Sequence, residues 1–142
     1  MQDKKKFEIS KSEKQLSISF SSSMDIIDKI DIETRRLLKD ELDDSHIFAL
    51  SLCMREGLTN AIKHGHRLDT DKITQYTLTI GEKTIIIEIE DQGEGFDWRK
   101  VRKKKTNPKL DHGRGLTIIN EYCSEYRYNE KGNKLTMIIH KS

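Results

Sequence analysis

Three short motifs follow one another in a fixed order and constrain the fold of this chain more than any other feature. They are E-G-L-T-N-A-I-K-H-G at 56–65, D-Q-G-E-G at 91–95 and H-G-R-G-L at 112–116. The first has a helical pattern, the second ends an apolar alternating run, and the third opens a further helix with glycines. Together they predict a nucleotide pocket that is neither a P-loop nor a Rossmann crevice.

The first motif places a carboxylate and a carboxamide on one helix face, because Glu56 and Asn60 are four residues apart. A carboxylate can act as a general base, and an amide oxygen is a hard ligand suited to magnesium. Magnesium takes most of its ligands from phosphates and water, so a single Asn60 is sufficient. An exposed polar helix face is the alternative for these two residues taken alone.

The second motif begins with Asp91, directly after the apolar run that ends at Ile89. A carboxylate at the end of a buried strand needs a hydrogen-bond partner, and the exocyclic amino group of adenine is a suitable donor. Gly93 and Gly95 carry no side chain, so a planar base could approach the backbone there. Taken alone, the motif also fits a plain turn.

The third motif has Gly113 and Gly115 on either side of Arg114, just before an expected helix. Backbone N–H groups at a helix N-terminus bind phosphate, and Arg114 could add charge-assisted bonds. A flexible loop end is the alternative for this motif by itself. The prediction therefore depends on the order and spacing of all three motifs.

The remaining periodicity predicts a two-layer α+β sandwich. Alternating apolar residues predict strands at 16–20, 76–80 and 85–89 and a last hairpin around 131–133, and helical spacing predicts helices over 24–42, from the Asp43 cap to Gly65, and over 114–123. Residues 96–111 have no apolar period, which indicates a long loop or lid. Its basic run at 99–105 is interpreted as a solvated lid rather than a nucleic-acid site, because the net charge is only +2.

Length and composition favour one intracellular domain. The 142 residues correspond to a single domain, in which 1–14 is expected to be a loosely ordered N-terminal segment. The start of the chain lacks the apolar run of a signal peptide, and no stretch approaches a membrane span, so a cytoplasmic protein is expected. Cys53 and Cys123 lack metal-ligand or redox spacing and are interpreted as free, small core residues.

The motifs resemble those of the GHKL ATPase superfamily, to which the histidine kinases belong. Within it, the chain is most similar to the anti-sigma regulatory factors, serine-protein kinases of the RsbW type. The resemblance rests on E-G-L-T-N-A-I-K-H-G-H-R, D-Q-G-E-G-F-D and H-G-R-G-L-T-I-I, together with the tail Y-R-Y-N-E-K-G-N-K-L-T-M. It implies an ATP-binding two-layer sandwich with a mostly antiparallel sheet and helices on one face.

The resemblance also implies roles for individual residues. Glu56 would be the catalytic base, and Asn60 would bind magnesium. Asp91 would hold adenine beside Gly93 and Gly95. The phosphates would be bound by residues of the first and third motifs, which are Lys63, His64, Gly113, Arg114, Gly115 and Leu116. Many superfamily members have a threonine near the adenine in the last hairpin, and here Lys134 takes its place with Thr136 two residues on.

The function that the resemblance implies is an ATP- and Mg²⁺-dependent serine/threonine protein kinase. It would phosphorylate an anti-sigma-factor antagonist of the STAS type and sequester a sigma factor or similar regulator, as a homodimer, without direct contact to nucleic acid or membrane. A binding module that holds nucleotide without phosphoryl transfer is the alternative. A histidine-kinase fragment is disfavoured, because no dimerising helix pair with an acceptor histidine precedes the motifs.

Overall fold

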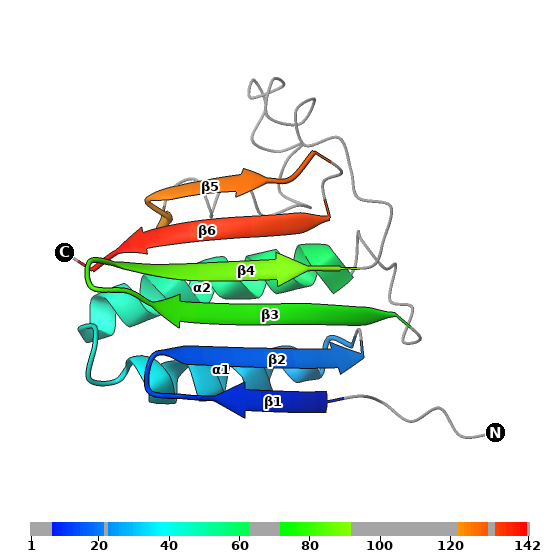
Figure 1. The fold of residues 1–142 in the computed structure, drawn as a ribbon, viewed down its shortest axis with the longest axis horizontal. Coiled ribbons are helices and arrows are strands. Elements are labelled where there is room, and N and C mark those ends of the chain that lie inside the picture. Colours follow the sequence, from blue (N-terminus) through cyan, green and yellow to red (C-terminus); the bar gives the residue numbers. More distant parts are fainter. Residues whose placement is uncertain (1–6, 22, 63–71, 92–121, 131–132, 142) are drawn as a thin grey trace.

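The computed structural model describes residues 7–21, 23–62, 72–91, 122–130 and 133–141. In these ranges it contains two helices and six strands, which are β1 (Phe7–Lys11), β2 (Gln15–Ser21), α1 (Ile26–Leu38), α2 (Asp44–Asn60), β3 (Ile73–Ile80), β4 (Thr84–Glu90), β5 (Glu125–Tyr128) and β6 (Lys134–His140). The strands form one sheet, and both helices lie on the same face of it (Figure 1). The predicted α+β sandwich with helices on one face is therefore confirmed.

The sheet is antiparallel throughout, with the order β1-β2-β3-β4-β6-β5. The central strand β4 pairs with its hairpin partner β3 on one side and with β6 on the other. In the second pairing Glu90 lies opposite Lys134. Asp91, which follows β4, therefore comes next to Asn133, which precedes β6.

The core lies between the helices and the inner face of the sheet. Along most of β2, β3 and β4, residues are alternately buried and half-exposed, as expected for a sheet covered on one face. The predicted apolar positions of these strands are buried, namely Leu16, Ile18, Phe20, Tyr76, Leu78, Ile80, Ile85, Ile87 and Ile89. The alternation in the sequence therefore predicted the inner face correctly.

The two helices begin and end close to the predicted positions. The first helix spans Ile26–Leu38 and is therefore shorter than the predicted 24–42. Residues 39–42 form a turn that leads to α2. Asp43 caps α2 as predicted, with its Oδ1 accepting a hydrogen bond from His46 N at 2.8 Å. The stripe from Ile47 through Leu58 is buried, and α2 packs against β4.

The N-terminal segment differs from the expectation of loose order over 1–14. Residues Phe7–Lys11 form β1, which pairs with β2 at the edge of the sheet. Phe7 and Ile9 alternate with polar residues, but these two positions lie in a stretch that is otherwise charged or polar, so the periodicity there is weak. Ile9 is 38% exposed at the edge of the sheet. It is held by backbone pairing and by Phe7, whose ring lies 4.2 Å from Lys29 Nζ.

Several predicted features lie outside the described residues. They are the helix stop at Gly65, the loop at 96–111 and nearly all of the helix expected over 114–123. Among the helices that the structure describes, none is long and apolar enough to cross a membrane.

Candidate functional site

A pocket lies where the end of α2, the end of β4 and the β5–β6 hairpin meet. It contains about 290 Å³ of empty space, including its opening to solvent, and it is lined by Gly57, Asn60, Ala61, Ile89, Asp91, Tyr128, Asn133 and Leu135. Apolar walls with a few polar groups are typical of sites that bind small molecules. Two of the three sequence motifs contribute to this lining, from positions about thirty residues apart in the chain.

The first motif contributes through the last turns of α2. Asn60 lines the pocket and is only 7% exposed. Glu56 lies one turn earlier on the same face and is half-buried, but it is not among the described lining residues. The structure therefore places Asn60 at the pocket and Glu56 one turn earlier on the same helix face, outside the described lining.

Gly57 allows α2 to approach the sheet closely. A Cβ atom at this position would lie 2.8 Å from Ile89 Cδ1 and 3.1 Å from Leu135 Cδ2. The missing side chain also leaves space at the pocket wall, where Gly57, Ile89 and Leu135 all contribute to the lining. This glycine belongs to the first motif, although the sequence pattern alone did not assign it a role.

Asp91 lies at the end of β4, as predicted, and is 7% exposed. Its backbone N–H donates to Asn133 O at 2.9 Å, which extends the β4–β6 ladder by one residue. The pocket therefore has a buried carboxylate at one end and the Asn60 carboxamide on the adjoining helix. This pair suits a ligand that offers a hydrogen-bond donor to the acid.

The last hairpin contributes residues that the sequence did not single out. Tyr128, Asn133 and Leu135 line the pocket, whereas Lys134 and Thr136 do not. Because side chains alternate along β6, these two lie on the opposite face of the sheet from Leu135. Lys134 Nζ is 3.3 Å from Glu88 Oε2 on that face. The adenine contact that many superfamily members make from this strand therefore has no counterpart at Lys134 or Thr136 among the described lining residues.

The other predicted site residues lie outside the described residues. These are Lys63, His64, Gly93, Gly95, Gly113, Arg114, Gly115 and Leu116. Their proposed contacts with base and phosphate stay predictions. In the part of the chain that the structure describes, no group of three or more His, Cys, Asp or Glu side chains could hold a metal ion.

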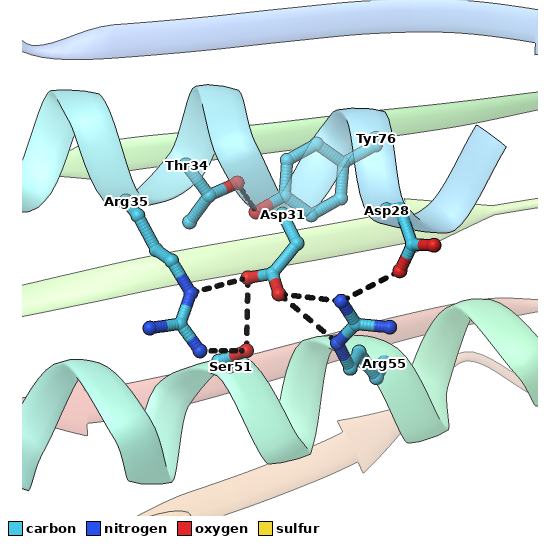
Figure 2. Close-up of polar contacts among 7 residues, drawn as sticks. All are labelled: Asp28, Asp31, Thr34, Arg35, Ser51, Arg55 and Tyr76. Atoms are coloured by element: carbon cyan, nitrogen blue, oxygen red, sulfur yellow. Dashed lines mark hydrogen bonds and ion pairs between the residues drawn. The ribbon is translucent and has the colours of Figure 1, made fainter.

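A buried carboxylate fixes α2 against α1 (Figure 2). Asp31 on α1 is 4% exposed. Its Oδ2 accepts from Arg55 Nε at 3.0 Å and Nη2 at 2.7 Å, and its Oδ1 accepts from Arg35 Nε at 3.1 Å and Ser51 Oγ at 2.8 Å. Two guanidinium groups and a hydroxyl thus satisfy one buried charge.

Two further contacts extend this network. Arg55 Nη2 lies 2.8 Å from the exposed Asp28 carboxylate, and the hydrogen bond to Asp28 is the main cause that raises the pKa of Arg55. Thr34 and Tyr76 share a buried hydrogen bond of 2.8 Å between their hydroxyls, which joins α1 to β3. Because Arg55 precedes Glu56, the network fixes the rotation of α2 next to the first motif.

The two cysteines are free and buried, as predicted. Their thiols are in hydrogen-bond contact, and this contact, together with burial, raises the pKa of Cys53. The Cys123 thiol also donates to Glu125 O at 2.8 Å. The hydrogen bond with Cys53 is the main cause that lowers the pKa of Cys123. Both residues serve as small core side chains.

Comparison with known proteins supports the interpretation of the pocket. The family model of the histidine kinase-like ATPase domain matches residues 29–139, which include every described residue of the pocket. An anti-sigma F factor of Clostridium perfringens (strain SM101) is 29% identical over 96 residues, which cover 65% of this chain and 69% of that protein. Another, of Geobacillus stearothermophilus, is 30% identical over 90 residues, covering 61% of this chain and 62% of that protein. A third, of Priestia megaterium, is 32% identical over 77 residues, about half of each chain.

Proposed function

This chain belongs to the histidine kinase-like ATPase domain family, and we propose that it is an ATP-dependent serine/threonine protein kinase and anti-sigma factor. The observation that carries the proposal is the pocket itself. It joins Asn60, from the end of α2, to Asp91, from the end of β4, across an apolar wall. An adenine nucleotide fits these two side chains. The carboxylate can accept a hydrogen bond from the adenine amino group, and the amide oxygen is a suitable ligand for a magnesium ion.

Each residue of the pocket would have a separate task. Asp91 would accept a hydrogen bond from the base, while Ala61, Ile89 and Leu135 would contact its faces. Asn60 would provide a protein ligand for Mg²⁺. When bound, ATP with Mg²⁺ supplies the phosphoryl group that is transferred. The glycines of the second motif would let the base lie close to the backbone. The backbone N–H groups of the third motif and the Arg114 guanidinium would donate hydrogen bonds to the phosphates.

Glu56 would take the proton of the attacking hydroxyl. Its half-buried position one turn before Asn60, on the same helix face, supports this role. A general base of this kind contributes typically ~10²–10⁴-fold to the rate. The alternative, a module that binds ATP without transferring phosphate, is favoured by one observation, which is that Glu56 is not among the described lining residues.

The proposed partners follow from the relatives that share the domain. Proteins of similar sequence are named anti-sigma F factors. We therefore propose that the phosphorylated protein is an anti-sigma-factor antagonist and that a sigma factor, or a comparable regulator, is sequestered. A homodimer in the cytoplasm is part of the same proposal.

Incubation with γ-labelled ATP, Mg²⁺ and candidate antagonist proteins tests this function. The expected result is transfer to a serine or threonine of the antagonist. Glu56→Gln should keep ATP affinity but slow transfer by about 10²–10⁴-fold. Glu88→Gln is the matched control, because Glu88 lies on the outer face of the sheet, and it should transfer at the wild-type rate.

The outcome also separates the two functions. ATP binding with no transfer to any antagonist would support the binding module instead. A stably folded Glu56→Gln variant with wild-type transfer rates would refute the base assignment. Capture of the sigma-type partner should survive Glu56→Gln, since sequestration does not require the proton transfer.

A further inference from the structure

Two asparagines close the β5–β6 connection next to the pocket. Asn129 Nδ2 donates to Asn133 Oδ1 at 2.8 Å, and Asn133 N donates to Asn129 Oδ1 at 3.0 Å. The same Asn129 oxygen accepts from Lys134 N at 3.2 Å, and Asn129 N donates to Lys134 O at 3.0 Å. The end of β5 is thereby fixed to the start of β6 by side-chain and backbone bonds together.

Asn133 connects this pair to Asp91 on the neighbouring strand. Asn133 Nδ2 donates to Asp91 O at 2.9 Å, and Asp91 N donates to Asn133 O at 2.9 Å. The orientation of the amide follows from its partners, since a carbonyl oxygen needs a donor and only the Nδ2 end provides one. Asn133 therefore has its amide nitrogen on Asp91 and its amide oxygen on Asn129.

These contacts lie just beyond the last residue of β4 that is paired with β6. The last paired residues of β4 and β6 are Glu90 and Lys134, so Asp91 lies one residue beyond the ladder. Asp91 and Asn133 both line the pocket, whereas the exposed Asn129 does not. The two bonds from Asn133 thus fix the backbone of the acid at the point where strand pairing ends.

We propose that Asn129 and Asn133 are positioning residues that set the preference of this pocket for adenine over guanine. The proposal rests on the function proposed above, in which Asp91 accepts a hydrogen bond from the adenine amino group. Hydrogen bonds weaken steeply with misalignment. A carboxylate held in one position accepts a well-aligned hydrogen bond from the amino group of adenine, whereas the carbonyl of guanine offers it no donor. A mobile carboxylate can adjust its position to either base, so the preference for ATP over GTP falls.

The ratio of the dissociation constants for GTP and ATP is the informative measurement. Both nucleotides carry the same phosphates, so a variant that merely loosens the fold should weaken both by a similar factor and leave the ratio unchanged. Asn133→Leu keeps the approximate shape and adds no charge while removing both side-chain bonds. Asn129→Leu removes the support of Asn133 without changing any described residue of the pocket lining.

Titration calorimetry with Mg²⁺ on the full chain should show a lower ratio in both variants. We expect a loss of about 3- to 10-fold for Asn133→Leu, which corresponds to about one net hydrogen bond. Asn129→Leu should change the ratio in the same direction by a smaller factor. Lys134→Ala is the matched control, because it removes the Glu88 ion pair on the outer face but keeps the backbone bonds to Asn129. Its ratio should equal that of the wild type.

Other results would contradict the positioning role of the two asparagines, or base recognition by Asp91, in distinguishable ways. Wild-type ratios in both folded variants would overturn the positioning role alone. A changed ratio in Asn133→Leu with an unchanged one in Asn129→Leu would show direct contact of Asn133 with the base, which also overturns it. Should Asn133→Leu fail to fold, the exposed Asn129→Leu variant decides the question. A wild-type chain that binds ATP and GTP equally would refute base recognition by Asp91, and the inference would fall with it.

Discussion

At the scale of single residues, the pocket depends as much on a missing side chain as on those present. Gly57 has no Cβ, and this absence lets α2 lie against Ile89 and Leu135. Asn60 and Asp91 could be picked from the sequence because their chemistry is visible in the motifs. Gly57 and Asn133 could not, because their roles depend on what packs against them.

Substitution of Gly57 tests this close approach. Gly57→Val should lower the free energy of unfolding by about 1–3 kcal/mol, the usual cost of overpacking a core. Gly57→Ala should cost less, because alanine offsets part of the clash through a helix propensity that is better by ~1 kcal/mol. Urea denaturation of the three proteins gives the comparison. Equal stability of Gly57→Val and the wild type would show that the helix is not held at this distance.

At the scale of elements, α1 and α2 are joined by charge as well as by apolar packing. Asp31 is buried, whereas the side chains of its partners Arg35 and Arg55 are 47% and 40% exposed. Removing Asp31 leaves two cations that water can partly solvate, so the cost should be lower than the ~3–5 kcal/mol of a fully buried pair.

A matched pair of variants measures this contribution. Asp31→Ala should lower the free energy of unfolding by about 1–3 kcal/mol, after discounting for the solvation of both arginines. Asp28→Ala removes the other carboxylate that Arg55 contacts, but the Asp28 side chain is 81% exposed, so the change should be much smaller. The two measurements are made by chemical denaturation at the same salt concentration. Similar losses in both variants would contradict the importance of the buried charge.

The N-terminal cap of α2 gives a prediction for low pH. The hydrogen bond from the His46 backbone, followed by those from the His46 and Ser45 side chains, lowers the pKa of Asp43 from 3.8 to about 2. A carboxylate with a depressed pKa stabilises the fold above its unfolded value and loses this effect as the pH falls through the folded value. The cap contribution should therefore disappear between about pH 4 and pH 2.

Thermal unfolding of the wild type and Asp43→Asn checks this window. Asparagine can still cap the helix but does not titrate. The melting temperature of the wild type should fall further between pH 4 and pH 2 than that of the variant. Parallel curves for the two proteins over this range would show that the Asp43 cap does not contribute to acid sensitivity.

At the scale of the whole molecule, the local sequence patterns predicted the helix and sheet layers but not the contacts between segments that are far apart in the chain. Alternation along 76–80 and 85–89 was sufficient to place β3 and β4, because a hairpin is a local structure. The contact between Asp91 and Asn133 depends on β4–β6 pairing across 42 residues, and no local period specifies that register. The edge strand β1 is not predicted either, because only two apolar residues alternate there and its place depends on backbone pairing with β2.

The pocket is therefore a product of the sheet order as much as of the motifs. Placing β6 between β4 and β5 brings the last hairpin beside the end of α2. Three segments that are far apart in the chain then provide one acid, two amides and an apolar wall. We propose that this arrangement binds ATP through recognition of the base by Asp91.

Calorimetric titration of the full chain with ATP and with GTP, in the presence of Mg²⁺, is the decisive test of base recognition by Asp91. ATP should bind more tightly by about 1–3 kcal/mol, because the carbonyl of guanine would leave the Asp91 carboxylate without a donor. In Asp91→Asn the affinity for ATP should fall markedly, and the preference over GTP should largely vanish. Equal affinity of the wild-type chain for the two nucleotides, or unchanged ATP affinity in Asp91→Asn, would contradict the assignment of this pocket.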